Sequence, residues 1–101
     1  MSIKILKLVN GEDVISTIGE GRGIVLENPI RLMSYPDPDT GGMAFMFVPW
    51  CPYSDKDIFT IAPANVIATI EEEEADEHLI REYREKFGSG VVTPPTSDLI
   101  L

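Results

Sequence analysis

Residues 7–18, KLVNGEDVISTI, decide the fold of this chain. Asn10 and Gly11 stand between two apolar runs, and both residue types tolerate the positive φ angles of a tight hairpin turn. The run before them, residues 3–9, has apolar side chains on both faces, which is typical of a strand inside a sheet or barrel. The run after them, residues 14–18, is β-branched at all but one position. The stretch therefore predicts a β-hairpin.

Further strand segments follow the hairpin and are separated by turn-forming residues: 24–35, 43–50, 59–61 and 66–70. Asn28 and Pro29 interrupt the first of them. Because proline donates no backbone hydrogen bond, we expect a bulge and a strong bend there. The segment 43–50 is apolar on both faces, so we expect the core to cover one face and a helix or a neighbouring subunit to cover the other.

After residue 71 the composition changes to helix-forming residues with a single apolar stripe at helical spacing, made of Ala75, Leu79, Ile80, Tyr83 and Phe87. Carboxylates crowd the start of this segment and cations its end, as the helix dipole favours. We therefore predict three parts: a β-barrel over residues 1–71, an acidic helix packed on or beside it over residues 72–88, and a tail over residues 89–101.

The charge is uneven along the 101 residues. Residues 1–70 carry eight carboxylates and five cations, a net charge of −3, and residues 71–101 carry nine and three, a net charge of −6. Nonspecific binding to nucleic-acid phosphates or to an anionic membrane is therefore unfavourable. No apolar run approaches the roughly 20 residues needed to cross a bilayer, and the single Cys51 cannot form an internal disulfide. We expect an intracellular, cytoplasmic protein with no membrane partner.

Two stretches resemble the motifs of the Sm-like (Lsm) family. Residues 7–18 together with IVLENPIRL, residues 24–32, look like the first motif of the family, and IAPANVIATIE, residues 61–71, looks like the second. The resemblance covers about residues 3–71. Within the family, the chain resembles short acidic Sm-like proteins of marine phages and metagenomes.

This resemblance implies a small, strongly bent, five-stranded antiparallel barrel of the Sm-like or SH3-like kind. It also implies a homo-oligomeric ring, in which the fourth strand of one chain pairs with the fifth strand of the next. The oligomer interface would then contain Phe59, Ile61, Val66, Ala68 and Ile70. The residues themselves support an open edge, because the last strand has no lysine or proline within it to prevent pairing.

Family members that bind RNA place an aspartate and an asparagine around the loop before the third strand and an arginine–glycine pair between the fourth and fifth strands. The corresponding positions here read GRGIVLEN, residues 21–28, and Ala62 followed by Pro63. Arg22 and Asn65 occupy the matching loops and are the candidate nucleic-acid-binding residues. The alternative roles are a solvated loop cation for Arg22 and a turn residue with positive φ for Asn65.

Enzymatic and metal chemistry have weak support in the sequence. Cys51 and His78 are the nucleophile and base to consider, but nothing in their spacing brings them together. One helix face carries Glu74, His78 and Glu82. Such a face is more commonly a solvated surface than a metal site. We expect a protein that is not an enzyme and that has no cofactor and no metal.

Two hypotheses for function stay open. The first is a ring that binds RNA at its pore, which follows from the resemblance and from Arg22. The second is a ring or adaptor that binds another protein and no nucleic acid. The second hypothesis is supported by the negative charge, by the missing arginine and by the apolar segments 50–53 and 99–101.

Overall fold

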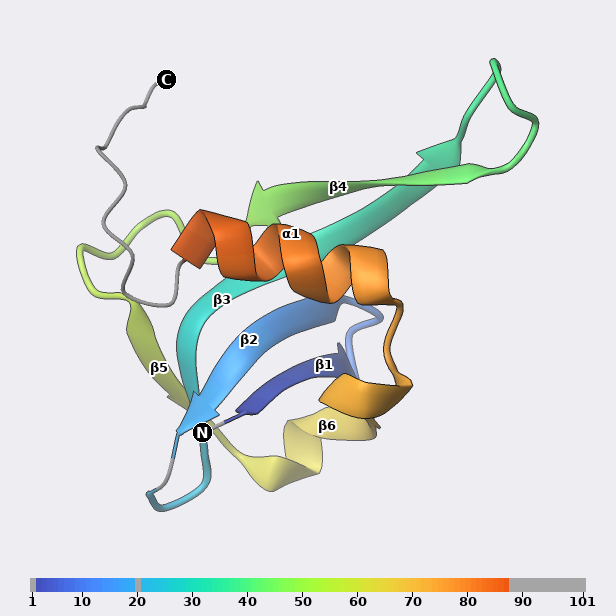
Figure 1. Ribbon diagram of the computed structural model, residues 1–101. Coiled ribbons are helices and arrows are strands. Elements are labelled where there is room, and N and C mark those ends of the chain that lie inside the picture. Colours follow the sequence, from blue (N-terminus) through green and yellow to red (C-terminus); the bar gives the residue numbers. More distant parts are fainter. Residues whose placement is uncertain (1, 20, 88–101) are drawn as a thin grey trace.

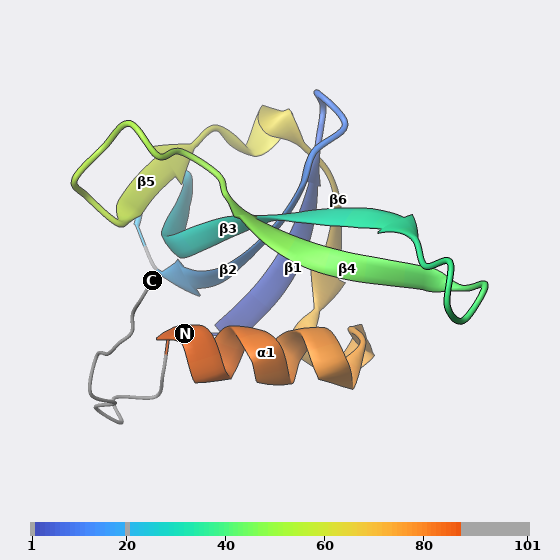
Figure 2. The same cartoon turned by 90° about the horizontal axis from the view of Figure 1, so that it is seen from above.

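The computed structural model describes residues 2–19 and 21–87. One antiparallel sheet of six strands forms one layer, and a helix crosses one face of it as the second layer (Figures 1 and 2). The strands are β1 (Ser2–Leu8), β2 (Asp13–Gly19), β3 (Ile24–Pro36), β4 (Met43–Pro49), β5 (Ile58–Ile61) and β6 (Val66–Glu71). The helix is α1 (Glu77–Phe87), and two short 3-10 turns are η1 (Pro63–Asn65) and η2 (Glu72–Glu74). The predicted mainly β fold with a C-terminal helix is confirmed.

The long strand β3 serves two neighbours. Its residues 24–27 pair with β5, and its residues 30–36 pair with β4. The rest of the sheet follows in the order β3, β2, β1, β6. As a result β4 and β5 lie along the same side of β3, separated by residues 50–57. Within the described residues no ladder joins β5 to β6, so the sheet is open between them.

The predicted bend in β3 is present at Asn28 and Pro29. Asn28 has a φ angle of 53°, which is uncommon for a residue other than glycine. Opposite it, the ladder between β2 and β3 shifts register between Ile15 and Thr17. Ser16 fills the bulge, is fully buried, and donates a hydrogen bond of 3.0 Å to the carbonyl of Glu27. The interruption by proline therefore marks the place where the strand turns from one partner to the other.

The predicted β1–β2 hairpin is confirmed as well. Its ladder runs from the pair Ser2 and Ile18 to the pair Lys7 and Asp13. In the turn, Gly11 has a φ angle of 92°. The Asn10 side chain stabilises the turn by accepting a hydrogen bond of 3.0 Å from the backbone N–H of Glu12.

Two apolar clusters lie on opposite faces of the sheet, which explains why β1 is apolar on both faces. On the side of α1, the buried residues are Ile3, Ile5, Ile15, Ile30, Leu79, Ile80 and Tyr83. On the other side they are Leu6, Leu8, Val14 and Leu26. Each fully buried aliphatic side chain contributes about 1.5–3 kcal/mol relative to its exposed state. The sheet is thus stabilised from both faces although only one face is covered by a helix.

The helix is shorter than the expected 72–88. The segment begins as the 3-10 turn η2, and α1 starts at Glu77 because Asp76 caps it: the Asp76 carboxylate accepts a hydrogen bond of 2.8 Å from the N–H of His78. The predicted apolar stripe faces the sheet, with Leu79 and Tyr83 buried in the first cluster. The predicted tail over residues 89–101 lies outside the described residues.

Tyr83 fastens α1 to the bend of the sheet. Its hydroxyl accepts a hydrogen bond of 2.9 Å from the N–H of Thr17, and its single proton is shared between the carbonyl oxygens of Glu27 and Asn28, which lie 3.0 and 2.9 Å away. The side chain is 1% exposed. One hydroxyl therefore joins the helix to the bulge of β2 and to the bend of β3.

Replacing Tyr83 by phenylalanine removes this hydroxyl and leaves buried backbone groups without their partner. We expect the free energy of unfolding to fall by about 1–3 kcal/mol, measured by urea denaturation. The matched control is Tyr53→Phe. Tyr53 is 93% exposed, so removal of its hydroxyl should change the free energy of unfolding little. Equal stability of the two variants would contradict the role given to Tyr83.

The burial of Tyr83 also predicts a pH dependence. Burial raises the pKa of Tyr83 above the usual 10.0, so the unfolded chain loses this proton at a lower pH than the folded chain does. The stabilising contribution is complete below pH 10.0 and declines as pH rises through the higher, folded-state pKa. Urea midpoints measured across this alkaline range should therefore fall more steeply for the unsubstituted chain than for Tyr83→Phe. Parallel pH profiles would rule out the assignment.

Candidate functional site

The strands β5 and β6 each have one unpaired edge. Within residues 2–19 and 21–87, β5 pairs with β3 alone and β6 pairs with β1 alone. The second edge of each strand presents backbone N–H and C=O groups that a further strand can bind. No lysine or proline interrupts the sequence VIATIE of β6. These two edges, joined through η1, form the candidate assembly site.

The predicted interface residues divide into two groups. Phe59, Ile61 and Val66 pack against the cluster of Leu6, Leu8, Val14 and Leu26, so their side chains hold the edge strands onto the sheet. Ala68 and Ile70 are exposed, and Ile70 retains 42% of its surface. The most exposed apolar side chains of these strands are Ile58 at 58% and Ile67 at 63%, and neither is among the predicted interface residues.

Arg22 and Asn65 lie in loops at opposite ends of β2. Arg22 is exposed in the loop that follows β2, and this loop approaches β5, since a Cβ at Gly23 would lie 3.0 Å from the carbonyl oxygen of Ile61. Asn65 ends the 3-10 turn η1, and its carbonyl accepts a hydrogen bond of 2.9 Å from Val9, beside the turn that precedes β2. The residue with positive φ is Asn28 rather than Asn65.

Glu12 holds the apolar segment that follows β4. Its Oε1 accepts hydrogen bonds of 3.1 Å from the indole of Trp50 and 3.0 Å from the side chain of Asn10, and its Oε2 lies 3.5 Å from Arg31. The Trp50 ring also packs edge-on against Phe59, with centroids 5.6 Å apart. Trp50 therefore has a structural role in fixing β5, and it is not a free surface anchor.

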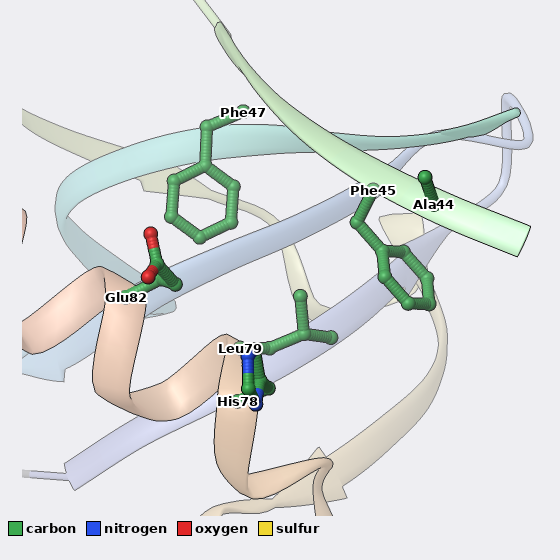
Figure 3. A pocket seen from close by; sticks show the side chains of 6 residues that line it. All are labelled: Ala44, Phe45, Phe47, His78, Leu79 and Glu82. Carbon is green, nitrogen blue, oxygen red and sulfur yellow. The ribbon is translucent and has the colours of Figure 1, made fainter. Parts of the chain in front are cut away.

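A groove lies between β4 and α1, with a volume of about 480 Å³ (Figure 3). Its lining consists of Ala44, Phe45, Phe47, His78, Leu79 and Glu82. The groove was not predicted from the sequence, which indicated only that the segment 43–50 is apolar on both faces. In Figure 3 both rings point from β4 toward the helix.

The expected cover of β4 on both faces is incomplete. Phe47 packs against the core beneath α1. Beyond it, the β3–β4 hairpin extends past the end of the helix (Figures 1 and 2), and the side chains of Met43, Phe45 and Met46 are 59, 49 and 47% exposed. Large exposed apolar side chains in a cluster are typical of interaction surfaces.

The structure adds nothing in favour of catalysis or metal binding. Cys51 is half-buried after β4 and His78 is exposed in the first turn of α1, and no hydrogen bond between described residues joins them. Among residues 2–19 and 21–87, no group of three histidine, cysteine, aspartate or glutamate side chains has the arrangement of a metal site. None of the helices in this described part has the length and apolar character needed to cross a membrane.

Comparison with known proteins gives no independent identification. No protein-family model matches the chain, and no curated protein matches it either.

Proposed function

We propose that this chain is a non-catalytic, Sm-like protein that assembles into a homo-oligomeric ring, in which β5 of one copy pairs with β6 of the next. The observation that carries the proposal is the open edge of β6, which is apolar and exposed at Ile67 and Ile70. A contact between two different edges is head-to-tail, and such contacts generate a ring when the rotation closes.

The proposal includes the five-stranded barrel. Because β4 and β5 follow each other along one side of β3, they correspond to one fourth strand that is interrupted by residues 50–57. The strand β6 then takes the place of the fifth. The bend at Asn28 and the turn η1, which leads the chain from β5 to β6, support the strong curvature that such a small barrel needs.

Edge pairing supplies the free energy for assembly in two ways. Backbone groups that are hydrated in the single chain gain hydrogen-bond partners across the interface. The isoleucines exposed on β5 and β6 lose their contact with water, each contributing about 1–2 kcal/mol. Both terms act between identical copies, in spite of the repulsion that a net charge of −9 per chain produces.

The assembly can be tested with Ile67→Lys. Ile67 is 63% exposed in the single chain, so lysine leaves the fold intact, but it places a charge in the proposed interface. We expect the native mass to fall to that of one chain, measured by native mass spectrometry or light scattering. The control is Val9→Lys, because Val9 is 57% exposed and lies in the β1–β2 turn. An unsubstituted chain of monomeric mass at micromolar concentration would refute the ring.

RNA is the ligand that we propose for the pore of the ring. The resemblance to Sm-like proteins supports it, and so does the exposed Arg22 in the loop beside β5. The net charge of −9 opposes it, so binding has to come from local contacts and has to weaken as salt rises. The alternative is a ring or adaptor that binds protein instead, which the exposed apolar residues of β4 favour.

Filter binding of oligo-U and oligo-A at low salt distinguishes these alternatives. If Arg22 contacts a phosphate, Arg22→Ala should reduce the slope of log affinity against log salt by roughly one. Lys56→Ala removes an equal charge from another exposed loop and should leave the slope unchanged. No retention of either oligonucleotide by the assembled protein would remove RNA from the proposal and leave the protein-binding ring.

A further inference from the structure

We propose that the groove between β4 and α1 binds a basic, amphipathic helical segment of a protein partner, with apolar side chains on Phe45 and Leu79 and a cation beside Glu82. This site is separate from the edges of β5 and β6, and it does not depend on ring assembly.

The apolar surface of the groove consists of Phe45, Phe47 and Leu79. Leu79 is 9% exposed and Phe47 packs against the same cluster, so these two form a fixed floor. Phe45 is 49% exposed and points toward the helix side, as Figure 3 shows. When a further apolar side chain covers a half-exposed aromatic ring beside a buried apolar surface, the free energy of the complex falls.

The negative charge at the groove comes from Glu82 and from the rest of α1. Glu82 lines the groove, and no ion pair holds it within the described residues. Residues 71–87 carry eight carboxylates and three cations, a net charge of −5. A cationic partner is attracted by this field. A second copy of the chain carries a net charge of −9 and is repelled by it, so a basic partner is the better complement.

The volume and the walls of the groove suit a helical partner. A volume of about 480 Å³ lies within the range of small-ligand pockets, roughly 300–1,000 Å³, which is room for a few anchoring side chains of a partner helix. The groove has a strand as one wall and a helix as the other. Such a groove accepts one apolar face of an amphipathic helix and leaves its polar face in water.

The test uses a fluorescein-labelled synthetic peptide of leucine and lysine, with the leucines at helical spacing. The comparison peptide has glutamate in place of every lysine. Fluorescence anisotropy is measured with the full chain at physiological salt. We expect the lysine peptide to bind and the glutamate peptide not to bind. If the full chain binds neither peptide, or binds both equally, the proposal is overturned.

Two matched pairs of variants assign the binding to the groove. Phe45→Ser should weaken binding of the lysine peptide about tenfold, while Met46→Ser should leave it unchanged, because Met46 is equally exposed but lies on the opposite face of β4. Glu82→Lys should also weaken binding about tenfold. Glu77→Lys changes the net charge by the same amount outside the groove and should have a smaller effect. Equal effects within both pairs would show nonspecific attraction to an acidic protein and overturn the proposal.

Other occupants of the groove give different results. A native mass that falls with Phe45→Ser but not with Met46→Ser would assign the groove to a second copy of the chain. Nuclear magnetic resonance signals of residues 88–101 that shift with Phe45→Ser, in the absence of peptide, would assign it to that segment. Either result overturns the proposal. Ile67→Lys tests ring assembly through the native mass and should leave peptide binding unchanged. Failure of the ring proposal can therefore be distinguished from failure of the groove proposal.

Discussion

The bend of β3 at Asn28 is the constraint on which the other contacts depend. A straight β3 would pair with one strand along this side, whereas the bent strand pairs with β4 and β5 in succession. The backbone of Asn28 connects the bend to its surroundings in two directions: its N–H donates to the carbonyl of Asp57 at 2.7 Å, and its carbonyl accepts from Tyr83 at 2.9 Å. The position of β5 and the position of α1 are thereby set by the same residue.

Local signals made most of the fold predictable. Three such signals each determine the structure of residues close to them in the sequence: the turn at Asn10 and Gly11, the proline after Asn28, and the helical stripe through Tyr83. Each feature was found where it was predicted. The start of α1 at Glu77 was missed, although the cap at Asp76 is also local. The glutamates and the alanine of residues 71–75 all have high helix propensity, so composition does not show where the first turn begins.

The candidate sites were less predictable because they depend on contacts between distant residues. Strands such as β5 and β6 are apolar on both faces, so alternation alone does not tell which face packs inward. The structure places Phe59 inward because Trp50 lies against it, and Trp50 is held in turn by Glu12, which is 38 residues away in the sequence. The groove depends likewise on α1 crossing beside β4. Neither arrangement follows from a pattern within one segment.

The two proposed surfaces differ in the forces that act on them. Edge pairing between β5 and β6 relies on backbone hydrogen bonds and on burial of isoleucine, and salt strengthens it by screening the repulsion between chains of net charge −9. The groove relies partly on attraction to Glu82 and its acidic neighbours, and salt weakens that attraction. If both proposals hold, high salt should favour self-assembly and low salt should favour the basic partner. Because the groove is lined by β4 and α1 and not by β5 or β6, occupation of one proposed surface does not block the other.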